Sequence, residues 1–211
     1  MKLFRIHWYD FGGLMSVFAL IFVLSEWDSF TNYELIMWFS FFSLLLHQVE
    51  EYRLPGTFPG MINRIMFKSD LPDRFPLNTN TAVYVNVYAG WTVYLLAAIL
   101  GEKSIWLGVL TMIISAGNVV VHTVLFNLKG KMFYNAGLVT CWILFVPIVS
   151  VFFVTVYSEN LASTADYLIG ITIGIGLNVF GIFKFINWLA DRKTVYVFPN
   201  RNLLPADRKK K

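Results

Sequence analysis

The sequence predicts an all-α, polytopic membrane protein with six transmembrane helices and both termini on the cytoplasmic side. Three observations lead to this fold class. Of the 211 residues, 57% are hydrophobic and only 14% are charged, which is more apolar surface than a soluble domain of this length can bury. The chain contains six long apolar segments. Its basic residues are concentrated in the connections that would lie on one side of a membrane.

The six apolar segments approach the roughly 20 residues that a helix needs to cross a bilayer. They cover residues 9–24, 33–49, 82–100, 105–126, 134–157 and 167–189. Asn86 lies in the third segment and Asn178 in the sixth. Because an amide in hydrocarbon needs a hydrogen-bond partner, we expect both side chains to face other helices.

The distribution of charge predicts the orientation. If the N-terminus is inside, the inner segments hold 16 of the 17 Lys and Arg residues, and only Lys103 falls outside. The outer loops carry the acidic residues Glu26, Asp28, Glu34, Glu102, Glu159 and Asp166. By the positive-inside rule, both termini are cytoplasmic. We expect a multi-pass protein of the cell membrane.

The segments predict one transmembrane domain over residues 1–211, with a cytoplasmic loop at 52–81 and a basic cytoplasmic tail at 190–211. The loop contains four prolines, which argue against a long helix. A short interfacial helix at 61–67 and a simple ordered loop are both consistent with this composition. The tail ends in Arg208 and three lysines, which favours contact with anionic headgroups.

The net charge of +4 does not indicate nucleic-acid binding, because the basic residues follow the membrane topology. We therefore expect membrane lipids as partners and no nucleic acid. The single cysteine, Cys141, lies within an apolar segment. It cannot form an internal disulfide or a thiolate cluster, and we interpret it as a small core residue.

The second apolar segment ends in the cluster His-Gln-Val-Glu-Glu at 47–51. Positions i, i+3 and i+4 share one helix face, so His47, Glu50 and Glu51 point the same way. Ionisable groups beside an apolar segment are costly, which favours a functional site. The alternative is that both glutamates are solvated at a helix end, although carboxylates there oppose the helix dipole.

The fourth segment carries a polar stripe with spacings of four, three and four residues: Thr111, Ser115, Asn118 and His122. We expect Thr111 and Ser115 to form interhelical hydrogen bonds. His122 lies near the cytoplasmic end of its helix, at the depth of His47, so these histidines and the two glutamates can meet. The third histidine, His7, precedes the first segment and is more typical of an interfacial side chain.

Two imidazoles and two carboxylates suit a divalent metal such as zinc, iron or manganese. We predict His47, Glu50, Glu51 and His122 as its ligands, and nothing indicates an organic cofactor. Copper(I) is disfavoured because no thiol is expected in the site. Glu51 or Glu50 would act as base, and Asn118 would orient a ligand or donate to an oxyanion. The same groups would also serve without metal, as a general base or a proton relay. The H-x-x-E-H protease motif matches only in part, because Glu51 stands in place of its second histidine.

These motifs resemble those of the HXXEE-domain membrane proteins, whose name describes the cluster at 47–51. That family is also marked by a further histidine, which His122 matches, and by a Tyr-x-Pro-Gly motif. Residues 134–137 read Tyr-Asn-Ala-Gly, with Ala136 in place of the proline. The resemblance spans about residues 47–137 and implies a site there, but the family has no assigned activity.

Three functions are compatible with these observations. The first is a metal-dependent membrane enzyme, a hydrolase or an oxidoreductase, that acts on a lipid or amphiphile at the inner leaflet. The second is a proton- or cation-coupled transporter, against which the lack of a visible half-repeat counts. The third is a structural or regulatory subunit in which the polar groups only pack helices.

Overall fold

The computed structural model describes residues 2–208, and the regular secondary structure of this range is entirely helical, as the sequence predicts. The α-helices of the bundle are α1 (Lys2–Ser25), α2 (Asn32–Tyr52), α4 (Thr79–Val83), α5 (Thr92–Leu100), α6 (Ile105–Val120), α7 (Asn127–Gly130), α8 (Leu138–Thr140), α9 (Val146–Ser158), α10 (Thr164–Gly176) and α11 (Ile182–Trp188). Four π-helical segments join them into longer rods: η3 (Tyr84–Trp91), η5 (Val121–Phe126), η6 (Cys141–Phe145) and η7 (Leu177–Gly181). The remaining short helices are α3 (Phe58–Met61), the π-helical η2 (Ile62–Met66), and the 3₁₀ turns η1 (Trp27–Ser29), η4 (Gly101–Ser104), η8 (Asn200–Asn202) and η9 (Pro205–Asp207).

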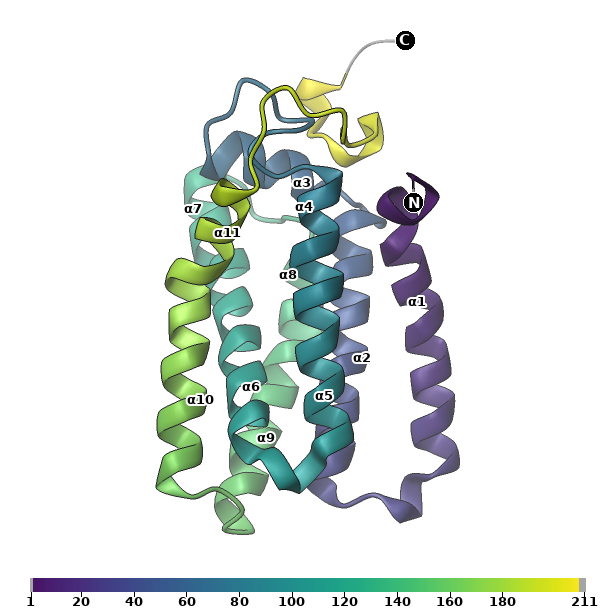
Figure 1. The fold of residues 1–211 in the computed structure, drawn as a ribbon, viewed down its shortest axis with the longest axis vertical. Helices are drawn as coiled ribbons and strands as arrows, with labels where there is room; N and C mark the ends of the chain where they lie inside the picture. Colours follow the sequence, from purple (N-terminus) through teal and green to yellow (C-terminus); the bar gives the residue numbers. More distant parts are fainter. Residues whose placement is uncertain (1, 209–211) are drawn as a thin grey trace.

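Four helical stretches are long and apolar enough to cross a membrane: Lys2–Ser25, Thr79–Gly130, Leu138–Ser158 and Thr164–Trp188. The second stretch has 52 residues, and it folds into two antiparallel rods that reverse direction at η4 (Figure 1). Gly101 permits this reversal, because its φ of 54° lies in the left-handed region that favours glycine. With α2, residues 2–208 therefore form six rods.

The observed helices extend beyond the predicted apolar segments where side chains pack. The first helix begins at Lys2 rather than at residue 9, because Trp8 and Tyr9 are buried against Tyr52. Helix α2 continues to Tyr52 rather than ending at residue 49. The whole polar cluster at 47–51 is therefore helical.

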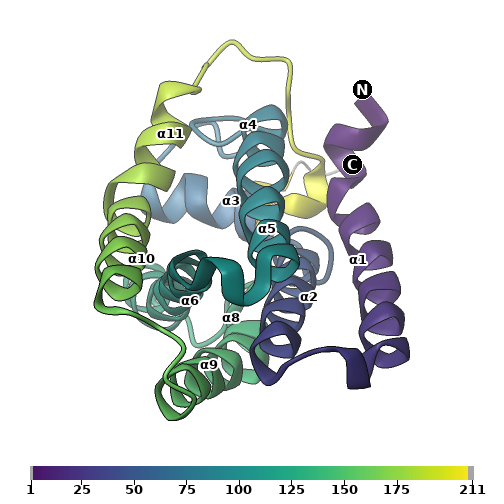
Figure 2. The same ribbon diagram turned by 60° about the horizontal axis from the view of Figure 1, so that its bottom comes forward.

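The bundle is arranged around α2 and α6. Helix α1 packs along α2 at one edge, and α10 packs along α6 at the other (Figure 2). Helices α5 and α9 contact α2 from different sides. As a result, the polar ends of α2 and of the α6–η5 rod both lie inside the bundle.

Polar side chains within the rods are satisfied largely as predicted. Asn178 donates to a carbonyl of α6 at 2.8 Å, and the Ser115 and Tyr94 hydroxyls are 2.8 Å apart. The prediction for the Thr111 side chain is wrong, because its hydroxyl donates to Gly108 of its own helix at 2.8 Å. The interhelical bond at this position uses the Thr111 carbonyl, which accepts from the Tyr94 hydroxyl at 3.0 Å.

The start of α1 and the last described residues lie at one end of the bundle, which we call the terminal end (Figure 1). The loop between α2 and α4 and the C-terminal segment, residues 189–208, pack together there. The backbone N–H of Thr79 donates to Tyr196 at 3.1 Å, and that of Phe198 donates to Asp73 at 2.8 Å. Within the predicted loop, α3 and η2 are helical, which agrees with the helix alternative for 61–67. Residues 209–211 of the predicted tail lie outside the described residues.

The C-terminal segment also fastens the loop to the end of α2. The buried amide of Asn202 donates to the carbonyls of Tyr52 at 2.9 Å and Gly56 at 2.6 Å. A Cβ at Gly60 would lie 2.7 Å from the Cα of Leu203, so the two backbones are in direct contact. These contacts hold the loop over the polar end of α2.

Candidate metal centre

The last turn of α2 carries the polar cluster of the sequence, and this turn is buried. His47 is 2% exposed, Glu50 is 7% exposed and Glu51 is 4% exposed. The alternative in which both glutamates are solvated at a helix end is therefore wrong. Buried ionisable groups need partners, and the partners come from distant parts of the chain.

His122, which η5 supplies, meets His47 inside the bundle. Their ring centroids are 5.0 Å apart and their planes make an angle of 83°. Glu51 lies against both rings: its Oε1 is 3.3 Å from Nε2 of His122 and 3.6 Å from Nε2 of His47. The structure thus brings three of the four predicted metal ligands together.

The hydrogen bonds of His122 fix its tautomer. Its Nδ1 lies 2.6 Å from Oδ1 of Asn135. The amide nitrogen of Asn135 donates to the His122 carbonyl at 2.7 Å and to Oδ1 of Asn127 at 2.8 Å. These two acceptors orient the Asn135 amide, so its oxygen accepts a hydrogen bond from Nδ1–H of His122. A neutral His122 then presents a lone pair on Nε2 toward Glu51.

A parallel argument fixes His47. Its Nδ1 lies 2.8 Å from Oγ1 of Thr140, and this hydroxyl lies 2.6 Å from Oε2 of Glu50. The hydroxyl donates its proton to the carboxylate, so it accepts from Nδ1–H of His47. Nε2 of His47 then also presents a lone pair, and this buried atom has no hydrogen-bond partner among the described residues.

Glu50 lies at the start of α8 and not between the histidine rings. Its carboxylate accepts from the N–H groups of Val139 at 3.2 Å and Thr140 at 2.8 Å, and from the Tyr134 hydroxyl at 3.1 Å. Partial burial and the Glu50 charge raise the pKa of Tyr134 to about 12, so this hydroxyl stays protonated and donates. An anion is stabilised at a helix N-terminus. The structure therefore places Glu50 behind His47, as its hydrogen-bonding support.

The turn at 134–137 lies against both imidazoles. Gly137 has a φ of 111°, and a Cβ there would lie 2.3 Å from Cε1 of His122 and 2.9 Å from Cε1 of His47. Only glycine fits this position. Ala136 is fully buried, so the turn forms with alanine in place of the proline.

Residues 38–153 match the family model described as "Protein of unknown function with HXXEE motif". The match covers more than half of the chain. The chain belongs to the HXXEE family. No curated protein and no solved structure matches it. Each residue of the histidine site lies within the matched range.

Within the HXXEE site, Cys141 is the residue whose position the sequence analysis missed. His47, His122 and Cys141 form a buried group whose ligand atoms lie within 4.8 Å of one another. The Cys141 Sγ is 4.0 Å from Nδ1 of His47, the nitrogen that already bonds Thr140. The expectation that no thiol reaches the site is therefore wrong. No local pattern signals this, because Cys141 lies in a different helix, 94 residues from His47.

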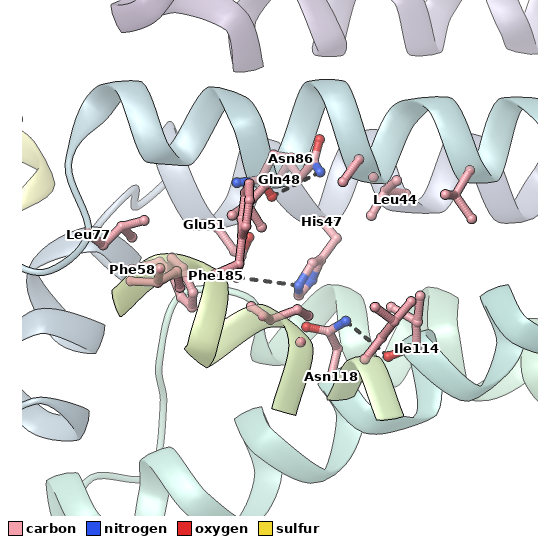
Figure 3. Close-up of a pocket in the computed structure, with 18 of the residues that line it drawn as sticks. Leu44, His47, Gln48, Glu51, Phe58, Leu77, Asn86, Ile114, Asn118 and Phe185 are labelled. Carbon is pink, nitrogen blue, oxygen red and sulfur yellow. Dashed lines mark hydrogen bonds and ion pairs between the residues drawn. The ribbon is translucent and has the colours of Figure 1, made fainter. Parts of the chain in front are cut away.

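Two further residues of the sequence analysis occupy separate positions. His7 lies on α1, with its Nδ1 2.7 Å from Oδ2 of Asp10, and it is not part of the histidine site. Asn118 donates to the Ile114 carbonyl at 3.0 Å. Its amide oxygen is turned away from Ile114, toward the space beside His47 (Figure 3).

That space is a cavity of about 470 Å³, bordered by the HXXEE motif. His47, Gln48 and Glu51 line it from α2, and Asn118 lines it from α6 (Figure 3). Asn86 also lines the polar part of the cavity, and its amide oxygen accepts from Gln48 at 3.2 Å. The Asn86 side chain therefore faces another helix, as predicted. The cavity gives a small molecule access to the histidine site.

Proposed function

We propose that the protein is a metal-dependent membrane enzyme whose metal is bound by His47, His122 and Glu51. The position of Glu51 Oε1, 3.3 Å and 3.6 Å from two Nε2 atoms, carries this proposal. Ligand atoms about 2.1 Å from a tetrahedral metal are about 3.4 Å from one another. Three protein ligands with one open position are the arrangement of a catalytic zinc site.

The electrostatics of the site support a bound cation. Two lone pairs and a carboxylate that face each other in a buried space repel unless a metal ion or a proton lies between them. Both Nδ1–H groups are held by oxygen acceptors, from Asn135 and from Thr140. Such supporting acceptors orient imidazole ligands and raise their basicity in known metal sites.

The donor set favours zinc or iron, with manganese third. Imidazole nitrogen suits zinc and iron, and a nearby thiol favours them over manganese. Cys141 is the alternative to Glu51 as third ligand, since its thiol forms a buried group with His47 and His122 whose ligand atoms lie within 4.8 Å of one another. Glu50 supports His47 through Thr140.

The chemistry that fits is hydrolysis at a carbonyl group of an amphiphile. A bound metal would polarise the carbonyl or lower the pKa of a bound water to about 7. Oε1 of Glu51 faces the histidines, and the second oxygen of that carboxylate can take the proton of the attacking water. Asn118 borders the cavity and would orient the substrate.

We also propose that all six rods cross the cell membrane, with both termini and the histidine site on the cytoplasmic side. Support comes from the sequence, in which 16 of the 17 Lys and Arg residues fall in the segments predicted to be inside. Lys103 belongs to η4, at the opposite end. The membrane-facing exterior is consistent with lipids as partners.

Elemental analysis of detergent-purified protein tests the metal. We expect about one zinc or iron per chain, and less than about a tenth of that in His47→Ala. His7→Ala is the matched control, because this histidine lies on α1 and bonds Asp10. Metal retained by His47→Ala would contradict the proposal.

Cys141→Ala and Glu51→Gln decide between the two candidate third ligands. We expect Glu51→Gln to lose the metal and Cys141→Ala to keep it. A metal-free protein that moves protons in liposomes when supplied with a transported solute would favour the transporter instead. A metal-free protein that is unaffected by Glu51→Gln would favour the structural subunit.

Tags at both termini test the topology. In spheroplasts treated with protease from outside, we expect both tags to survive, because the basic segments hold both ends in the cytoplasm. Loss of either tag would contradict the orientation.

A further inference from the structure

The cavity beside the histidine site lies between two rods, and its walls are apolar stripes. From η3, the stripe consists of Val85, Ala89 and Gly90, continued by Val93 in α5; from η7 and α11, it consists of Leu177, Gly181, Ile182, Phe185 and Ile186. These spacings of three and four place each stripe on one face of its rod. The residues at its edges are partly exposed, including Ala89 and Gly181. The space is therefore reached sideways, between the two rods.

One end of this apolar space is polar. Gln48 and Asn86 form a hydrogen-bonded pair there, with the Gln48 oxygen accepting from Trp91 at 2.6 Å. The carboxylate of Glu51 and the amide oxygen of Asn118 add acceptors on the same boundary. Among the described residues that line the cavity there is no Lys or Arg. The polar end therefore offers no basic Lys or Arg side chain for an anionic headgroup, and it has oxygen acceptors for a donor.

We propose that this cavity binds the single apolar chain of a lipid-derived amphiphile whose neutral headgroup carries a hydroxyl or amide donor. The chain lies between the η3 and α11 stripes, and the headgroup lies against Glu51 and Asn118. The volume of about 470 Å³ is within the range of pockets that hold one small molecule. Binding of the amphiphile does not require the metal, because the cavity and its polar end are formed without one. Only hydrolysis of the bound amphiphile rests on the proposed function.

Entry from the membrane follows from the exterior of the same rods. Tyr84 and Tyr88 of η3 and Val179 and Phe180 of η7 are exposed beside the stripes. In a bilayer these side chains face lipid, so a chain that leaves the lipid phase passes between aromatic and aliphatic side chains.

A photoactivatable long-chain alcohol or amide, with a diazirine in the chain, tests the proposal in purified full-length protein. We expect crosslinked peptides from the two stripes. Gly90→Leu should lower this labelling at least about fivefold, because the larger side chain fills the space. A Cβ there makes ordinary contacts, with the Val85 carbonyl at 3.5 Å, Gln48 at 3.7 Å and Leu44 at 3.8 Å. Gly176→Leu is the matched control, since a Cβ at this glycine meets nothing within 4 Å and Gly176 does not line the cavity.

Metal content, measured on the same samples, separates this proposal from the proposed function. The elution volume in size-exclusion chromatography shows whether each variant is folded. Labelling of the stripes in metal-free His47→Ala protein supports the cavity even if no metal is found in the wild type. If Gly90→Leu does not fold, Ala89→Phe narrows the rim and should give the same loss.

Labelling that is unchanged in a folded Gly90→Leu or Ala89→Phe variant, or that is spread over the exterior of the bundle, would overturn the proposal. Stronger labelling by a carboxylate or phosphate amphiphile of equal chain length would overturn the headgroup assignment.

Discussion

The two ends of the bundle satisfy their polar groups by different means. At the end opposite the terminal end, Thr31 with Glu34 and Ser163 with Asp166 form exposed capping boxes, each within three residues. The partly buried bond from the Trp106 N–H to Asp166, at 3.1 Å, is a longer-range contact there. At the terminal end, Glu50 bonds Thr140 from 90 residues away, inside the bundle. Water can replace the exposed cap hydroxyls, whereas the buried groups around Glu50 depend on one another.

This difference predicts that substitutions at the terminal end are strongly coupled and that those at the opposite end are not. Residues that share one buried site have non-additive effects.

Removal of the histidines should have the largest effect. We expect His47→Ala and His122→Ala each to lower zinc affinity more than about hundredfold, and the double variant to be little worse than either, because one missing imidazole already opens the site. Calorimetric zinc titration of the metal-free protein measures this. Additive losses would show that the two rings bind separate ions. They would contradict the inference that the buried groups at the terminal end form one coupled site.

The two glutamates should differ from each other. Glu50→Gln replaces the charged acceptor of the Val139 and Thr140 N–H groups by a neutral amide, so we expect it to lower the free energy of unfolding by about 2 kcal/mol. Glu51→Gln should mainly remove the metal and change the stability of the metal-free protein by less than about 1 kcal/mol, because the carboxylate faces two lone pairs. Denaturant unfolding in mixed micelles and zinc titration give the two readouts. A stable Glu50→Gln variant that loses the metal would identify Glu50 as a ligand, as the sequence first suggested.

The support of His47 by Thr140 should have an intermediate effect. Thr140→Val removes the hydroxyl that accepts from Nδ1, and we expect about a tenfold loss of zinc affinity. Thr140→Ser keeps the hydroxyl and is the control, with less than about a twofold loss. Equal effects of both substitutions would indicate a packing role for the lost methyl group.

Removal of the helix cap at Ser163, at the end of the bundle opposite the terminal end, should have the smallest effect. Ser163→Ala removes the hydroxyl that accepts from the Asp166 N–H, and we expect a loss of about 1 kcal/mol in the free energy of unfolding with unchanged zinc affinity. The same two measurements serve here. A change in zinc affinity would show that the two ends are coupled through α10 and α6.

The all-α class and the turn of α2 on which His47, Glu50 and Glu51 share a face could be predicted from the sequence alone, as could the apolar character of the long helices. These features follow from hydropathy and helix periodicity, which act over a few residues. The sequence also indicated that His122 meets His47, because both lie near the same end of rods that run in the same direction. The packing of Trp8 and Tyr9 that extends α1 was not visible to hydropathy.

The partner of each polar group depends on how the helices pack. The two adjacent glutamates separate because Glu51 faces the rings, while the start of α8 binds Glu50. Cys141 and Asn135 enter the site through a turn that Gly137 permits, at distances along the chain that no local pattern spans. The physical reason is that a buried polar group is stabilised by whichever partner the packed helices bring within about 3 Å, and packing is a property of the whole bundle.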